Sequence, residues 1–307
     1  MNSSRRGTLY LIDTSIYIFR AWFALPDSIT GPDGEPVNAI RGYTDFLLKF
    51  LEEAKPVHVA AAFDGSQTES FRKQIYPDYK ANREPAPPEL KTQLAACKKI
   101  TRALGIYTTT SNTHEADDLI GTLARRFGSN KKRVCILSRD KDLGQLLLNT
   151  GDVLWDFAAN VCMDSKAIQQ KLGVKPELIP DYLGLAGDAV DNIPGVPGVG
   201  AKTAAALLAE FGALENVYEC LDDILEMNLR GAKRVHALLK AHRQQAMLSR
   251  ELATIAIDAP VDARLNTLNW QGIQTKPIER LYDQYGFGVV TRQRTARLKQ
   301  AQDHNLQ

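Results

Sequence analysis

The amino-acid sequence predicts an α/β fold, in which a mostly parallel sheet is followed by an all-helical region. Through the first half of the 307-residue chain, short apolar runs alternate with helical periodicity. This alternation is typical of parallel sheets with right-handed crossovers. After about Leu172 the strand-like runs stop and only helical patterns remain. A content of 44% hydrophobic and 24% charged residues fits an ordinary globular protein, long enough for two domains.

The predicted strands are short apolar segments of the first half, at residues 9–13, 57–64, 105–109, 134–138 and 152–156. Helical periodicity occupies residues 38–54, 89–104, 116–127 and 141–147 between them. Residues 66–88 interrupt this alternation, because they are basic and aromatic and end in prolines. Such a composition favours an insertion over the edge of the sheet.

In the second half, helices are predicted at residues 176–185, 201–210, 231–250 and 278–285. We therefore expect an α/β domain over residues 1–171, a helical domain over residues 172–293 and a polar tail over residues 294–307. Four widely spaced cysteines include no CxxC pair, which argues against a zinc site. The chain shows no signal peptide or membrane-spanning run, so we expect a cytoplasmic location and no membrane partner.

Basic residues gather locally although the net charge is only +2. Residues 69–102 hold eight bases against four acids, and residues 230–250 hold a second basic stretch. A solvated helix face explains either stretch alone. Beside an acidic metal site, both stretches favour contacts with phosphates.

Acidic residues follow several predicted strands. Asp13 ends the first strand, Asp64 ends the second, and Asp140 and Asp142 follow the fourth. Ends of parallel strands meet at one sheet edge, where ligands usually bind. Crowded carboxylates take up protons unless a cation neutralises them, and Mg²⁺ does so through oxygen ligands. Because paired ions of this kind cleave phosphodiesters, the pattern predicts a metal-dependent nuclease.

The motif Glu115-Ala116-Asp117-Asp118 follows a polar run and is predicted at a helix N-terminus, where carboxylates are favoured. Simple capping would explain such a cluster by itself. Glu115 and Asp117 are two residues apart, and in a tight turn both reach the acids at the strand ends. Asp118 adds a third carboxylate to the motif.

The stretch from Gly187 to Thr203 is the most specific of the chain. It holds Asp188 and Asp191, which share a face if helical, then a glycine- and proline-rich hairpin and a helix start. Backbone N–H groups at such a start hold a phosphate without reading sequence. A nucleotide-binding P-loop is rejected, because Ala201 intervenes before Lys202 and no strand precedes.

Together these motifs resemble the 5′-nuclease family, which includes the N-terminal 5′→3′ exonuclease domain of bacterial DNA polymerase I, phage 5′-nucleases and flap endonucleases. The resemblance covers residues from about 9 to the early 260s and rests on four motifs in family-like order: FDG, EADD, DKD and GDxxDNIPGVPGVGxKTA. It implies a PIN-like domain with a helical arch, then a helix–hairpin–helix-type domain. Because the chain stops far short of a polymerase, it resembles a free-standing member.

By this resemblance, two Mg²⁺ or Mn²⁺ ions would be bound by the acids. Asp13, Asp64, Glu115 and Asp117 would surround the first ion. Asp117 would also face the second ion, with Asp140, Asp142, Asp188 and Asp191. Asp118 would be an additional carboxylate beside them. The assignment of each acid to one ion stays open.

The same resemblance makes residues 66–88 the arch through which 5′ single strands pass. Lys80 and Arg83 would act catalytically at the scissile phosphate, and Arg72 would contact DNA. Tyr76 and Tyr79 would stack on bases, although packing within the arch explains both equally well. The hairpin would grip duplex DNA and bind K⁺ or another monovalent cation over residues 195–200. Its DNA-binding residues would be Gly195, Val196, Gly198, Gly200, Lys202 and Thr203.

The function so implied is a structure-specific 5′→3′ exonuclease or 5′-flap endonuclease acting as a monomer. Its partner would be DNA with a 5′ flap, a nick or a 5′ single-stranded end, with an RNA primer on DNA as a further candidate. Two rivals remain open: a DNA-structure-binding protein without turnover, and a PIN-type ribonuclease. Metal-dependent cleavage separates the first from the enzyme, and flapped DNA against single-stranded RNA separates the second.

Overall fold

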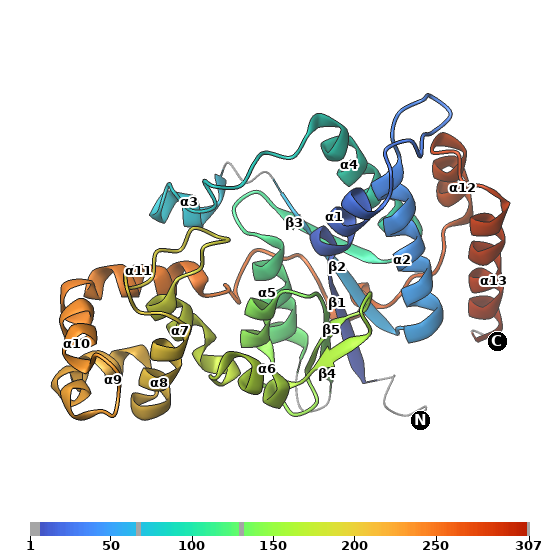
Figure 1. Cartoon of the computed structure of the whole chain (residues 1–307). Coiled ribbons are helices and arrows are strands. Elements are labelled where there is room, and N and C mark those ends of the chain that lie inside the picture. The colour runs from blue at the N-terminus through green and yellow to red at the C-terminus, as the bar shows by residue number, and fades with distance from the viewer. Residues whose placement is uncertain (1–6, 66–68, 129–131, 306–307) are drawn as a thin grey trace.

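The computed structural model describes residues 7–65, 69–128 and 132–305. A six-stranded sheet lies at the centre of its first half (Figure 1), in the order β3-β2-β1-β4-β5-β6. The strands are β1 (Thr8–Asp13), β2 (His58–Asp64), β3 (Tyr107–Ser111), β4 (Arg133–Leu137), β5 (Val153–Asp156) and β6 (Val161–Met163). All neighbouring pairs are parallel except β5 and β6, which form an antiparallel hairpin. The predicted sheet is confirmed, and the short edge strand β6 was not predicted.

Both faces of the sheet are buried, as expected for parallel strands. In β1, Leu9 and Leu11 belong to one hydrophobic cluster, whereas Tyr10 and Ile12 belong to another. The first cluster takes in α5 (Ala116–Phe127) and continues into the second half of the chain. The second cluster takes in α2 (Asn38–Ala54) and α4 (Pro88–Ala103).

Helix predictions in the first half hold closely for α2, α4 and α5. The segment predicted at 141–147 is a 3-10 helix, η2 (Lys141–Leu146). Helix α1 (Thr14–Ala24) follows β1 directly and was not predicted. At its first residue, Thr14 Oγ1 donates to the Ala62 carbonyl of β2 at 2.7 Å, which fastens the start of α1 to the neighbouring strand.

The inserted segment crosses the carboxyl edge of the sheet between β2 and α4 (Figure 1). It contains one short helix, α3 (Phe71–Ile75), and then consecutive turns over residues 77–82. Residues 66–68 of the expected arch lie outside the described residues. Prolines at positions 77, 85 and 87 remove N–H donors, which explains why no longer helix forms in this segment.

The second half is helical, as predicted. Its elements are α6 (Ser165–Leu172), η3 (Pro176–Leu178), α7 (Ile179–Ala186), α8 (Ala201–Phe211), α9 (Leu214–Glu219), η4 (Leu221–Glu226), α10 (Ala232–Ala241), α11 (Arg243–Ala253) and η5 (Leu265–Leu268). The single helix expected at 231–250 is two helices that meet at His242. Figure 1 shows α7 to α11 gathered at one end of the molecule.

At the other end lie α12 (Thr275–Gln284) and α13 (Val289–Asn305) (Figure 1). Residues expected to begin a polar tail are therefore helical. Arg294 donates to both carboxylate oxygens of Glu52 on α2 at 2.7 Å, and buried Thr295 bonds Tyr282 on α12. These long-range contacts, which local polarity does not reveal, fasten α13. Within the described part of the chain, no helix combines the length and apolar character needed to cross a membrane.

Candidate active site

Asp13 lies at the end of β1, in the middle of the sheet edge. The residue is 4% exposed, and its carboxylate accepts a hydrogen bond from Ser138 Oγ at 2.8 Å. Burial, together with the nearby charges of Asp64 and Asp140, raises the pKa of Asp13 to about 7. Asp13 is thus a buried acid whose ionised form needs a cation.

Asp64 ends the adjacent strand β2 and connects two helices. One of its oxygens accepts from Ser15 Oγ at 2.6 Å, and the other accepts from the backbone N–H of Ala116 at 2.9 Å. Because Ser15 is on α1 and Ala116 begins α5, Asp64 aligns both helix starts with the strand ends. Part of its charge therefore stabilises the first turn of α5.

The three acids at the start of α5 point in different directions. Asp117 faces the strand ends: burial raises its pKa well above its usual range, and Asp13 and Asp140 raise it further. Glu115 faces the inserted segment, where it accepts hydrogen bonds from Tyr79 and Lys80. Asp118 is fully buried, and its carboxylate accepts from the backbone N–H groups of Glu115 and Ala256. A tight helix start therefore brings Asp117 to the cluster but takes Asp118 away from it.

Asp140 and Asp142 follow β4, as the sequence predicted. Asp140 begins η2 by accepting the backbone N–H of Asp142 at 3.0 Å, and Ser138 Oγ accepts the N–H of Asp140. Burial raises the pKa of both acids, and the charges of Asp188 and Asp191 contribute to the rise, which brings the pKa of Asp142 to about 7. The loop after α7 therefore lies against this side of the cluster.

Asp188 and Asp191 lie in a turn and not on a helix, which corrects the expectation of a shared helical face. Gly187, with φ of +72°, ends α7, and Asp188 pairs with Ile193 across the turn. The Asp188 carboxylate accepts the N–H groups of Val190 and Asp191. The turn brings both carboxylates to the cluster without helical periodicity.

Lys80 lies directly on this cluster although it is nearly buried. Its ammonium donates to both oxygens of Glu115, at 2.8 and 2.9 Å, and lies 3.4 Å from Asp191. Burial lowers the pKa of Lys80, but Glu115, Tyr79 and Asp191 together outweigh burial, so the pKa lies above its usual range and the amine stays charged. Arg83 forms an ion pair with Asp191. The inserted segment thus supplies two cations to the acidic cluster.

Two residues predicted to contact DNA are internal. Arg72 is 2% exposed, and its guanidinium donates to both oxygens of Asp118 at 2.7 Å and to the carbonyls of Leu252 and Thr254. Tyr79 is 3% exposed, and its hydroxyl donates to Glu115. The predicted DNA contacts of Arg72 and Tyr79 are wrong for the same reason. In this segment, polar side chains donate hydrogen bonds to buried carboxylates and carbonyls.

The hairpin at 195–200 is partly buried. Gly195 donates its N–H to Ser249 Oγ, and Val196, 2% exposed, donates its N–H to the Leu185 carbonyl. The side chain of Val196 therefore cannot contact DNA as predicted. Gly198, Gly200 and Lys202 are exposed, and Thr203 is half-buried.

The donors of the acidic cluster suit a hard divalent cation, because all are carboxylate oxygens. Among the described residues, no three His, Cys, Asp or Glu side chains are arranged as a ready metal-binding group. Glu115 and Asp191 are turned to Lys80, and the oxygens of Asp140 and Asp188 accept backbone N–H groups. The acids raise one another's pKa, so the carboxylate oxygens of this cluster suit a bound cation. Their side-chain rotamers, however, are not arranged around a single ion position.

Two serines of this site were not predicted. Ser15 and Ser138 donate to Asp64 and Asp13, and so orient the carboxylates at the ends of β2 and β1. Each serine lies within two residues of a strand end. This position is only a weak indication of a role in the site, because other polar residues near the strand ends have it too.

Two family models match the chain over nearly its whole described length. The model of the 5′-3′ exonuclease N-terminal resolvase-like domain matches residues 8–173, and that of the 5′-3′ exonuclease C-terminal SAM fold matches residues 174–276. The chain belongs to the 5′-3′ exonuclease family. The predicted family and fold are thereby confirmed.

Relatives of the 5′-3′ exonuclease family differ in length. The 5′-3′ exonuclease of Buchnera aphidicola is 32% identical over 93% of this chain and 99% of its own length. DNA polymerase I of Bacillus caldotenax is 39% identical over 91% of this chain, and that of Pseudomonas aeruginosa 40% identical over 92%. The chain spans 31% of the length of each of these two polymerases.

Solved structures share the fold of this 5′-3′ exonuclease family member at low sequence identity. A zinc-bound 5′-exonuclease of phage T5 has a TM-score of 0.65 and 19% identity, covering 90% of this chain and 99% of its own. The catalytic core of Rad2 in complex with DNA substrate has a TM-score of 0.64 and 16% identity, covering 96% of this chain and 92% of its own.

Proposed function

We propose that this chain is a structure-specific 5′→3′ exonuclease and 5′-flap endonuclease that hydrolyses DNA phosphodiesters with two Mg²⁺ or Mn²⁺ ions. One observation carries the proposal. Asp13, Asp117, Asp140 and Asp142 come from three separate segments, yet each has a pKa raised by burial and by neighbouring acids. Such a cluster at the carboxyl edge of a parallel sheet fits paired divalent cations.

In this proposal the acids hold the ions in two groups. Asp13, Asp64, Glu115 and Asp117 would hold one ion, and Asp140, Asp142, Asp188 and Asp191, with Asp117, would hold the other. Bound in pairs, such ions activate water and stabilise the leaving 3′ oxygen. Lys80 and Arg83 form ion pairs with Glu115 and Asp191, which supports the proposal that their positive charges would stabilise the attacked phosphate.

The proposed substrate is DNA with a 5′ flap, a nick or a 5′ single-stranded end, with an RNA primer on DNA as a second form. Rad2 and T5 flap endonuclease are described in complexes with DNA, which supports a DNA partner. Exposed Gly198, Gly200 and Lys202 would contact duplex phosphates. We further propose that residues 195–200 bind K⁺ or another monovalent cation. The protein would act as a monomer in the cytoplasm, with domains at residues 1–171 and 172–293.

A panel of labelled substrates tests the proposal. It holds a 5′-flapped duplex, a nicked duplex, a blunt duplex, single-stranded DNA and single-stranded RNA. We expect cleavage of the flapped and nicked DNA with Mg²⁺ or Mn²⁺ and none in EDTA. Asp140→Asn should lower the single-turnover rate at least about 100-fold, because it removes a carboxylate that would hold the proposed ions beside the reacting phosphate.

Asp258→Asn, a change at an exposed acid outside the cluster, is the matched control and should leave the rate unchanged. Cleavage that persists in EDTA would refute the metal-ion mechanism. Preferential cleavage of the RNA would instead favour the ribonuclease interpretation.

A further inference from the structure

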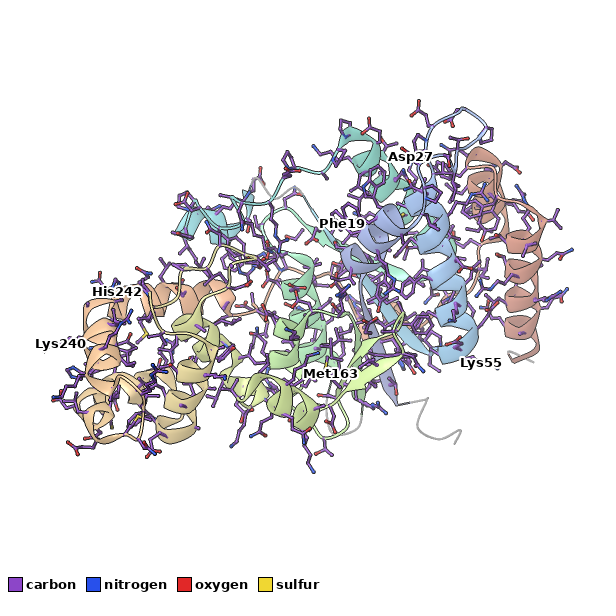
Figure 2. The ribbon with its side chains drawn as sticks, in the orientation of Figure 1. Phe19, Asp27, Lys55, Met163, Lys240 and His242 are labelled. Atoms are coloured by element: carbon purple, nitrogen blue, oxygen red, sulfur yellow. The ribbon has the colours of Figure 1, made fainter. Side chains whose placement is uncertain are left out.

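A groove of about 700 Å³ lies between the inserted segment and the corner where α10 meets α11. Its walls include Tyr76, Lys240, His242, Arg243, Gln244 and Gln245. Figure 2 labels Lys240 and His242 at this corner. Residues more than 160 positions apart in the chain thus face one space.

The lining of this groove is cationic and amide-rich. Lys240 and Arg243 are exposed, and no carboxylate is among the described residues that line it. The guanidinium carbon of Arg243 lies 5.3 Å from the centre of the Tyr218 ring, which limits its movement. The groove therefore favours an anionic ligand.

Hydrogen bonds hold the walls in place. Gln245 Nε2 donates to the carbonyl of Gly195 at 2.8 Å, which ties the start of α11 to the hairpin. Tyr76 donates its N–H to the Arg72 carbonyl, and its half-buried ring packs against the hydrophobic core. The aromatic wall is thus anchored through Arg72, and the cationic wall is anchored through the hairpin.

We propose that this groove binds a nucleotide unit of the single-stranded 5′ tail, with its phosphate on Lys240 and Arg243 and its base against Tyr76. Cations that contact phosphate, next to an aromatic ring that stacks on a base, are the usual means of holding single strands without reading sequence. A groove of this volume holds a ligand of about one or two nucleotides and not a duplex. The inference rests on the proposed function, because it names a subsite for that substrate.

Binding in EDTA tests the groove without requiring cleavage. Fluorescence anisotropy compares a duplex carrying a 5′ single-stranded tail with the same duplex lacking it. For Lys240→Ala with Arg243→Ala, we expect the affinity for the tailed duplex to fall about tenfold. Its salt dependence should become shallower by roughly 0.7 per lost phosphate contact, and the untailed duplex should lose much less.

The matched control is Lys276→Ala with Arg280→Ala, which removes two exposed charges from α12 at the opposite end of the molecule. This control should bind both duplexes as the unmodified protein does. A fluorescent 2-aminopurine in the tail reports stacking: Tyr76→Ala should abolish its quenching, and Tyr76→Phe should retain it. Circular dichroism and thermal unfolding of each variant establish that it is folded.

Loss of affinity that is equal for the tailed and untailed duplexes would overturn the inference, as would unchanged binding by the double variant. The two proposals fail separately. If the unmodified protein cleaves flapped DNA with Mg²⁺ but the double variant binds the tail normally, only the groove is refuted. If the double variant loses tail binding but the unmodified protein cleaves nothing with Mg²⁺ or Mn²⁺, only the nuclease proposal is refuted.

Discussion

Arg72 and Asp118 form a buried ion pair that fastens the inserted segment to the helix carrying Glu115 and Asp117. The side chains of the pair are 3% and 0% exposed, and further bonds from Arg72 reach the Leu252 and Thr254 carbonyls at the end of α11. One guanidinium therefore connects α3, α5 and α11. The predicted DNA contact of Arg72 is wrong, because an arginine in a basic segment has the same sequence pattern whether it binds DNA or a buried carboxylate.

Removing one partner of this pair should destabilise the protein strongly. Arg72→Met leaves the Asp118 carboxylate buried without its cation, which costs about 3–5 kcal/mol of unfolding free energy. Urea unfolding measures it, with Arg292→Met as a control, because the more exposed pair of Arg292 with Asp283 contributes only about 0–1 kcal/mol. A loss below about 1 kcal/mol for Arg72→Met would contradict the structural role of the pair.

The acidic cluster predicts an unusual dependence of stability on pH. Asp13 and Asp142 have folded-state pKa values of about 7, above the value of 3.8 for an unperturbed carboxyl. The native state therefore holds protons that the unfolded chain has released. In EDTA, unfolding free energy should fall as pH rises from about 4 to about 7 and then level off.

Thermal unfolding in EDTA across pH 4–8 measures this effect at these two acids. Asp13→Asn with Asp142→Asn should flatten the profile, whereas Asp258→Asn should not. Added Mg²⁺ should reverse the loss near neutral pH, because the ion binds the ionised acids. A flat profile for the unmodified protein would show that the acids are not buried together.

At the scale of elements, the predictions hold where periodicity and caps are local. Residues 38–54 and 116–127 are helices with the predicted limits. The predictions are wrong where the end of a helix, or the packing of a helix on its neighbours, depends on residues distant in sequence. The helix predicted at 231–250 breaks at His242, and the polar residues after Arg294 are helical because α2 and α12 hold them.

The hairpin offers a matched pair of glycine substitutions. Gly195 has φ of +58°, and a Cβ there would lie 2.3 Å from the Gly187 nitrogen. Gly195→Ala should cost at least about 1–2 kcal/mol for the left-handed backbone, with backbone overlap added, and should weaken duplex binding. Gly200 has φ of −94° and open space around its Cβ position.

Gly200→Ala should therefore cost less than about 1 kcal/mol, mainly as a poorer helix N-cap. Chemical unfolding and binding to untailed duplex DNA compare the two variants. Equal stability of both would show that the contact between Gly195 and Gly187 does not determine the hairpin conformation.

At the scale of the whole molecule, one hydrophobic cluster joins the two halves of the chain. It runs from Leu9 on β1 through Leu119 on α5 to Ile179 on α7 and Leu239 on α10. The regions matched by the two family models therefore share a core. The acidic cluster lies across the same junction, since Asp13 belongs to the first region and Asp188 to the second.

A shared core predicts a single cooperative unfolding transition. Calorimetry in EDTA should give one peak, with a calorimetric enthalpy close to the van't Hoff enthalpy. Two separate peaks would instead show that the helical region unfolds by itself and that the junction contributes little stability.

The local sequence pattern alone was sufficient to predict the parallel strands, most of the helices and the acids that follow β1, β2 and β4. This is possible because side-chain periodicity is a short-range property, and parallel strands bring their ends to one edge. Only the folded chain reveals that Arg72 and Tyr79 are internal, that Lys80 lies on Glu115, and that Tyr76 faces Lys240 and Arg243. These contacts join residues far apart in sequence. Each depends on the path of the chain, and a basic or aromatic residue suits a buried network and a DNA surface equally well.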